Sequence, residues 1–363
     1  MTPYRKQKRK HFWRTAAAKD TARALSTFYT PKFKIAKSTK VAAAGSCFAQ
    51  NIRRHLIQNG YQFVDFETAP PFFPEVERKS FGYELFSARF GNIYTLEQLH
   101  QLALRSFGQF ETSEPFWEKD SRFFDPLRST IEPNGFASIE DAQAARASHL
   151  RRVREMFLHA DVLIFTLGLT ETWISQEDGT VFPLCPGVNA GVFDDEKYAF
   201  SNTGFSENLE SFCTLRRFLK SQNPDLKFIL TVSPVPLEAT ATAHNVICAT
   251  SYSKSVLRAV AGTVCDQFPD VDYFPSYEIF TSPLFKGQFY QDNMRDPSPD
   301  GIAAAMDLFF SAHQADQKTV PAPHITPPAP NTAAAAKEAA DRFAAEQQTI
   351  CDEMLLGNEN REL

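Results

Sequence analysis

The chain has 363 residues, of which 43% are hydrophobic and 22% are charged, a composition typical of a folded globular protein rather than a disordered one. Its 38 basic residues are outnumbered by 43 acidic ones, so no overall positive field would recruit nucleic acid or an anionic lipid surface. Six dispersed cysteines without a C-x-x-C pair favour a reducing, cytoplasmic setting over a disulfide framework.

No apolar run approaches the roughly 18 residues of a membrane-spanning helix, and the basic start of the chain lacks the apolar centre of a signal peptide. We therefore expect no integral membrane association. Residues 1–30 are predicted to be a basic N-terminal arm, 314–332 a Pro-rich linker and 333–363 an Ala-rich helical tail. Between them, residues 31–313 are expected to form one α/β domain.

The first strand is expected at residues 40–45, followed by a helix over 47–59 that Gly60 terminates. Residues 66–134 are rich in Phe, Pro and Gly and show weaker periodicity, which indicates an insertion or cap over the sheet. Such insertions commonly set substrate selectivity.

Helix-to-strand units then repeat along the chain. The predicted pairs of helix and strand are 141–159 with 161–168, 208–220 with 227–233, and 253–268 with 271–274, before a final helix over 299–310. Continuous apolar strands alternating with helices predict a mostly parallel, doubly wound sheet with helices on both faces.

Ligands of open α/β sheets bind outside the carboxyl ends of the strands, and Ser46 follows the first of these ends directly. A serine between a strand and a helix exposes its oxygen beside converging backbone N–H groups, which suits a nucleophile. The alternative is that Ser46 only caps the helix. Cys47 could also be the nucleophile, but that position commonly faces the core.

Four motifs in order resemble the GSCFA domain family, which is placed among the SGNH (GDSL-like) hydrolases. They are GSCFA at 45–49, TLG at 166–168, TVSPV at 231–235 and YFPSYEI at 273–279. The resemblance covers roughly residues 30 to 310 and implies an SGNH/flavodoxin-like α/β fold.

The resemblance also implies roles for particular residues. Ser46 matches the superfamily's nucleophile, and Gly91 with the adjacent Asn92 matches donors to the oxyanion. The superfamily's Gly-x-Asn-Asp block corresponds to residues 168–171, so the further oxyanion or substrate-binding candidates are Gly168, Thr170 and Glu171. A threonine hydroxyl in place of the asparagine amide still donates one hydrogen bond.

The C-terminal block departs from the family pattern. Fuller members resemble Asp-x-x-His-Pro-Ser, whereas residues 293–298 read NMRDPS, with Asp296 in place of the histidine. Serine needs an adjacent base, and the candidates are Asp296, Asp292 and His244. His149 is a weaker candidate, because it sits inside a predicted helix.

These observations support two hypotheses. The first is a serine ester hydrolase or O-acyltransferase that acts through an acyl-enzyme on Ser46, with a small-molecule or glycan ester as substrate. The second is an inactive SGNH-like protein that binds carbohydrate or acyl groups and has lost its base. No cofactor and no metal are expected, since neither a nucleotide-binding glycine motif nor a metal-ligand cluster occurs. The sequence does not specify the oligomeric state.

Overall fold

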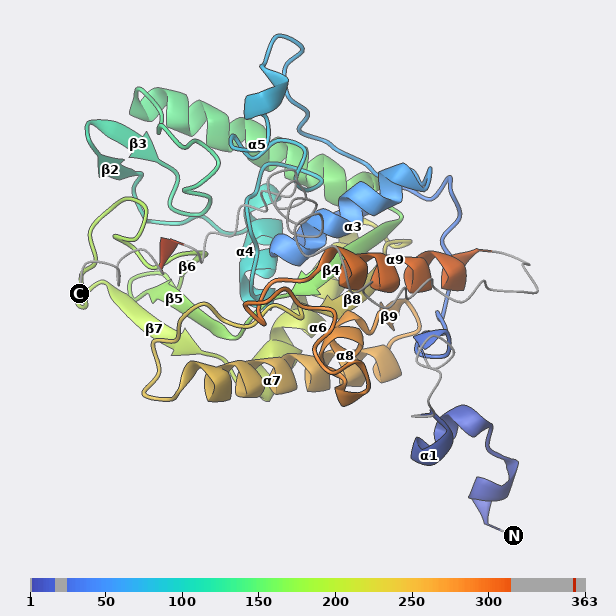
Figure 1. Ribbon diagram of the computed structural model, residues 1–363. Coiled ribbons are helices and arrows are strands. Elements are labelled where there is room, and N and C mark those ends of the chain that lie inside the picture. The colour runs from blue at the N-terminus through green and yellow to red at the C-terminus, as the bar shows by residue number, and fades with distance from the viewer. Residues whose placement is uncertain (1, 17–24, 315–354, 357–363) are drawn as a thin grey trace, which may run out of the picture. The chain divides into compact units, whose positions relative to one another are not determined.

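The computed structural model describes residues 2–16, 25–314 and 355–356 (Figure 1). Nearly all of the expected linker and helical tail lies outside these described residues. The chain divides into two compact units. In the described residues, one unit comprises 2–16, 25–36 and 274–314, and the other comprises 37–273 with 355–356.

The larger unit is built on a four-stranded parallel sheet in the order β1-β4-β8-β9. The strands are β1 (Val41–Gly45), β4 (Val162–Leu167), β8 (Lys227–Val232) and β9 (Val271–Tyr273). Val41 forms a further parallel bridge to Phe63. Strand β1 therefore has a parallel neighbour on each side, β4 on one and the residue Phe63 on the other. This arrangement confirms the predicted doubly wound α/β fold and places a topological switch beside β1.

The apolar runs explain why these segments form central strands. All six residues of β4 and five of the six residues of β8 are buried, as expected for parallel strands covered on both faces. Short side chains at Ala42, Ala43 and Ala44 make β1 equally buried. The predicted strand boundaries hold to within one residue.

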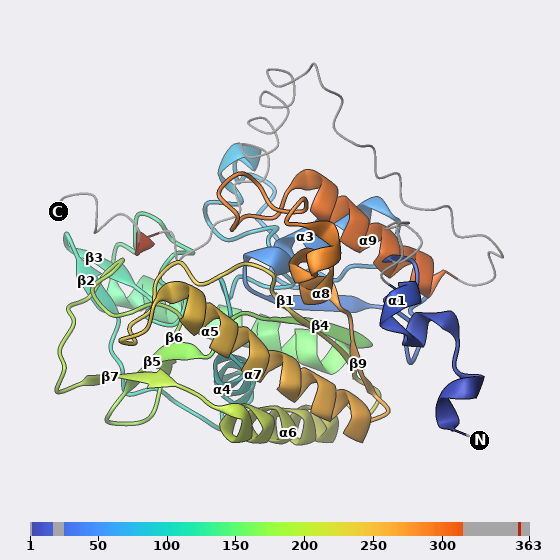
Figure 2. The ribbon, with the colours of Figure 1, turned by 60° about the horizontal axis from the view of Figure 1, so that its bottom comes forward.

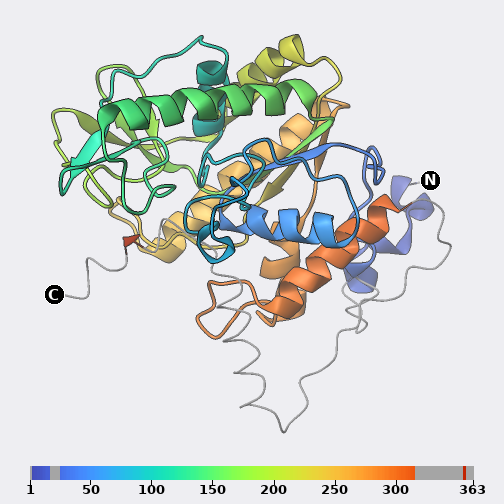
Figure 3. The same ribbon diagram turned by 90° about the horizontal axis from the view of Figure 1, so that it is seen from above.

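Helices cover both faces of this sheet (Figures 2 and 3). One face carries α3 and the other carries α4 to α7. Their bounds are α3 (Cys47–Gln58), α4 (Leu96–Ser106), α5 (Ile139–His159), α6 (Phe205–Gln222) and α7 (Val246–Gln267). Gly60 follows α3 with a φ of +72°, the left-handed conformation expected of a residue that ends a helix.

Two smaller sheets, which the sequence patterns do not predict, extend the larger unit. A hairpin joins β2 (Trp117–Lys119) to β3 (Arg122–Phe124), and an antiparallel sheet of order β6-β5-β7 follows β4. Its strands are β5 (Glu171–Ser175), β6 (Val181–Phe182) and β7 (Tyr198–Asn202). Aromatic side chains from the hairpin and this sheet share one buried cluster that includes Trp117, Phe182 and Tyr198.

The smaller unit contains short helices and an aromatic core. Its elements are η1 (Pro3–Lys6), η2 (Arg9–His11), α1 (Trp13–Ala16), α8 (Ser276–Thr281), η4 (Pro283–Phe285) and α9 (Pro299–His313). The rings of Tyr29 and Phe274 lie 5.3 Å apart and those of Phe274 and Phe309 lie 5.1 Å apart. These contacts join the segment before residue 36 to the C-terminal helix α9.

Candidate active site

The register of the parallel sheet aligns the carboxyl ends of β1, β4 and β8. Gly45 pairs with Thr166, and Thr166 pairs with Thr231. The residues that follow these strand ends, Ser46, Gly168 and Ser233, line one cavity of about 220 Å³. We call it the Ser46 cavity, and its remaining lining residues are Cys47, Tyr94, Leu169, Val235, Pro236, Leu237 and Lys254.

The position of Ser46 depends on the glycine before it. Gly45 has a φ of +140°, and a Cβ atom built on it would lie 2.7 Å from Cβ and 2.9 Å from the backbone nitrogen of Thr166. Only a residue without a side chain permits this close approach. Gly45 therefore lets β1 run against β4 up to the point where Ser46 begins.

Ser46 is the N-cap residue of α3, but its side chain forms no capping hydrogen bond. The residue is 3% exposed, and within the described parts of the chain its Oγ has no hydrogen-bond partner. A buried hydroxyl without a partner costs free energy of folding, so a functional role explains its presence better than a structural one. The geometry does not support the alternative in which Ser46 serves only as a helix cap.

Lys254, which sequence reasoning missed, lies on α7 and lines the Ser46 cavity. It is 2% exposed, and its Nζ donates a hydrogen bond to the carbonyl of Gly168. The sequence held a signal for it. Lys254 stands three and seven residues before the buried Leu257 and Ala261, which is the spacing of one helix face.

The loop that carries Gly91 and Asn92 runs beside the end of β1, because the N–H of Ile93 donates to the carbonyl of Gly45 at 3.0 Å. Gly91 has a φ of +71°. Asn92 is buried, but it lines a second cavity. Tyr94, two residues after Asn92, lines the Ser46 cavity. The short segment from Asn92 to Tyr94 therefore separates the two cavities.

Thr170 and Glu171 both form hydrogen bonds with other segments of the larger unit. The Thr170 N–H donates to Ser253 Oγ at 2.9 Å, and its hydroxyl donates to Asn202 Oδ1 at 2.6 Å. The Glu171 carboxylate accepts from the Thr240 hydroxyl at 2.7 Å and from the N–H of Ala241 at 3.2 Å. Glu171 thereby anchors the loop that follows β8, whose first residues line the Ser46 cavity.

The candidate bases belong to two different units of the chain. His244 is exposed, in the loop between β8 and α7. Asp292 and Asp296 belong to the smaller unit, where Asp292 is exposed and the Asp296 carboxylate accepts from Asn293 Nδ2 at 2.7 Å. Arg295 pairs with the other oxygen of Asp296 at 3.1 Å.

His149 is placed by the structure in the second cavity. Its Nδ1 lies 2.6 Å from Glu67 Oε2, and burial, followed by the positive charge of Arg128, lowers its pKa to about 4. His149 is therefore a buried, neutral residue above that pH, as its position in a helix suggested.

In the parts of the chain that the structure describes, no group of three or more His, Cys, Asp or Glu residues could hold a metal ion. Across the same residues, no helix combines the length and the apolar character that crossing a bilayer requires.

The fold and the site define an α/β protein with a serine at the switch point of a parallel sheet. The GSCFA family model matches residues 40–309, so this chain belongs to the GSCFA family. No curated protein matches it. Among solved structures, a carbohydrate esterase family 3 protein from Talaromyces cellulolyticus is similar at 12% identity with a TM-score of 0.28. That match covers 75% of this chain and 94% of the other.

Proposed function

We propose that the protein is a serine-dependent ester hydrolase whose nucleophile is Ser46. The observation that carries this proposal is the buried Ser46 hydroxyl, which neither caps its helix nor has a hydrogen-bond partner among the described residues. It lies where α/β proteins bind their ligands, at the carboxyl ends of the strands. A hydroxyl kept free of structural bonds is available to attack a substrate.

The proposed reaction has two steps. In the first, Ser46 Oγ attacks the acyl carbonyl, its proton passes to a general base, and the base returns that proton to the departing alcohol oxygen. In the second, water attacks the acyl-enzyme and releases the acid and the free serine. The Nζ group of Lys254, which lines the same cavity, would donate a hydrogen bond to the developing oxyanion.

For the general base we propose Asp296, which takes the place of the histidine in the family pattern. Its carboxylate is oriented by Asn293 and Arg295. Asp292 and His244 remain the comparison candidates. Replacing each in turn by Asn or Ala assigns the role, because only loss of the base lowers kcat by the factor of about 10² or more typical of general base catalysis.

The walls of the Ser46 cavity favour a short acyl group. They are mainly apolar, with Val235, Pro236 and Leu237 from the loop after β8, and the space of about 220 Å³ between them, which includes its opening to solvent, suits a short acyl chain. Glycan and small-molecule esters carry acyl groups of this kind. A sugar hydroxyl in place of water in the second step would make the same site an O-acyltransferase.

The test is hydrolysis of p-nitrophenyl acetate, butyrate and octanoate. We expect turnover of the acetate and butyrate but not the octanoate, and we expect Ser46→Ala to abolish it. Ser138→Ala is the matched control, because Ser138 caps α5 away from the cavity. Turnover that survives in Ser46→Ala would refute the proposal.

The alternative, an inactive binding protein, predicts a different pattern. Wild-type protein would then turn over none of the esters, and the acyl compounds would bind equally to wild type and Ser46→Ala.

We also propose a cytoplasmic location, supported by the dispersed cysteines, of which the five that the structure describes are free. Cell fractionation with an antibody against the protein tests that assignment.

A further inference from the structure

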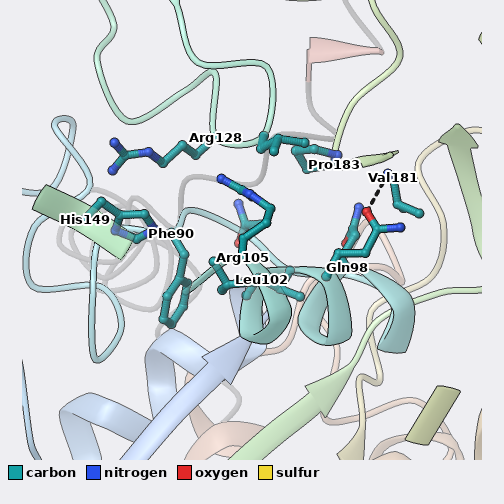
Figure 4. Close-up of a pocket in the computed structure, with 12 residues that line it drawn as sticks. Phe90, Gln98, Leu102, Arg105, Arg128, His149, Val181 and Pro183 are labelled. Atoms are coloured by element: carbon teal, nitrogen blue, oxygen red, sulfur yellow. Dashed lines mark hydrogen bonds between the residues drawn. The ribbon is translucent and has the colours of Figure 1, made fainter. Parts of the chain in front are cut away.

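A second cavity, of about 420 Å³, lies within the larger unit between α4, α5 and the segment around Arg128 (Figure 4). We call it the arginine cavity. In the close-up, Arg105 rises from α4 toward the segment that carries Arg128, with His149 and Phe90 on one side and Val181 and Pro183 on the other. Its apolar lining consists of Phe90, Ile93, Leu102, Leu127, Val181 and Pro183.

Arg128 is 3% exposed, and its guanidinium is only partly satisfied. Nε donates to Asp125 Oδ2 at 3.0 Å, and Nη1 donates to the carbonyl of Arg89 at 3.3 Å. Nη2 is buried and has no hydrogen-bond partner in the described chain. Buried guanidinium donors are normally satisfied, so this nitrogen, on the His149 side of the cavity (Figure 4), is a donor available to a further acceptor.

Arg105 supplies a second set of donors. Among the residues described, no hydrogen bond or ion pair involves its guanidinium. Burial lowers the pKa of Arg105 to about 10. The negative charge of Asp125 opposes this shift, and the positive charges of Arg146 and Arg128 add to it. Arg105 therefore remains charged at neutral pH while it is held partly out of water.

The charges around the cavity do not balance. Three guanidiniums, those of Arg105, Arg128 and Arg146, face two carboxylates. Asp125 pairs with Arg128 at 3.0 Å and with Arg146 at 2.7 Å. Glu67 lies 3.9 Å from Arg128 and accepts from His149, which is neutral at pH 7. Within the described part of the chain, one positive charge is therefore left without a counter-charge.

We propose that the arginine cavity binds a small organic carboxylate through Arg105 and Arg128. A guanidinium fork matches the two oxygens of a carboxylate, and a single negative charge neutralises the surplus. The apolar side chains accept a short hydrocarbon tail. The side chains of Gln98 and Gln101 do not compete, since they already bond to the backbone around β6.

This binding site does not depend on the reaction proposed for Ser46. The segment from Asn92 to Tyr94 lies between the two cavities, because Asn92 and Ile93 line one and Tyr94 lines the other. An occupant of the arginine cavity would stiffen the wall of the Ser46 cavity. Binding is nevertheless expected to be the same in wild type and in Ser46→Ala.

The experiment measures thermal unfolding and calorimetric binding of the full chain with butyrate, with the isosteric neutral butyramide, and with inorganic phosphate. The informative variant is Arg105→Gln, because the Arg105 guanidinium makes no hydrogen bond or ion pair with the residues that the structure describes, so its loss should leave the fold intact. Arg152→Gln, an exposed arginine on α5, is the matched control.

We expect butyrate, but not butyramide, to raise the unfolding midpoint of wild type and of Arg152→Gln. Arg105→Gln should weaken butyrate binding by about tenfold or more, the usual scale for a lost charged hydrogen bond. Without ligand, the unfolding midpoint of Arg105→Gln should not fall below that of wild type, because the substitution removes a partly buried charge that lacks a counter-charge among the described residues. Equal effects of butyrate and butyramide, tighter binding of phosphate, or full binding by Arg105→Gln would each overturn the proposal.

Discussion

Replacement of Gly45 by alanine tests how the sheet positions Ser46. The added Cβ would lie 2.7, 2.8 and 2.9 Å from the Cβ, carbonyl oxygen and nitrogen of Thr166, and two of these atoms are backbone atoms that cannot move aside. Strain at a positive φ costs about 1 kcal/mol or more, and overpacking of a rigid site costs roughly 1–3 kcal/mol. We therefore expect Gly45→Ala to lower the free energy of unfolding by about 3 kcal/mol.

The assay is equilibrium unfolding in urea, with Gly108→Ala as the matched control. Gly108 also has a positive φ, +69°, but its added Cβ would meet nothing within 4 Å. The control carries the milder strain of a left-handed residue, so the difference between the two variants measures the steric contact with β4 together with the additional strain at a φ of +140°. A difference below about 0.5 kcal/mol, within the usual error of additivity, would refute the claim that Gly45 is required for close strand packing.

Three further predictions concern single side chains. Ser46→Ala should change the unfolding free energy by less than about 0.5 kcal/mol, whereas Ser138→Ala should cost about 1 kcal/mol, because only Ser138 caps its helix; equal losses in urea titrations would contradict this. Asp125→Asn should cost about 3 kcal/mol in the same assay, because it removes the buried carboxylate charge that Arg128 and Arg146 share; a loss under about 1 kcal/mol would contradict the pairing. Since the folded pKa of His149 is lowered to about 4 from 6.5, the folded state binds fewer protons, and stability falls as pH drops from 6.5 toward 4. His149→Gln should flatten that part of the stability profile, and an unchanged profile would refute the assignment.

The central sheet was predictable because its strands are continuous apolar runs, such as residues 162–167, between amphipathic helices. The antiparallel sheet was not. Its strands are two to five residues long, and β7 is half-exposed, so neither an apolar run nor a full alternation marks them. Glu171 begins the strand β5 of this sheet, and its carboxylate anchors the loop at Thr240.

The candidate nucleophile was predictable for a local reason: a strand, a glycine and a serine at a helix start are adjacent in sequence. The rest of the site depends on tertiary contacts. Lys254 reaches the Ser46 cavity from a helix more than 200 residues later in the chain, and Arg105 of α4 and Arg128 of an irregular segment line a common cavity. Only the folded chain shows that these two arginines line the same cavity.

The central claim is that Ser46 carries an activated hydroxyl, and a fluorophosphonate probe tests it most directly. Attack by Oγ forms an O–P bond and expels fluoride, while the base takes the proton. We predict a single adduct by intact-protein mass, mapped to the peptide that contains Ser46, absent from Ser46→Ala and retained in Cys47→Ala. No adduct at high probe concentration, or an adduct on the peptide that contains Ser233, would contradict the account.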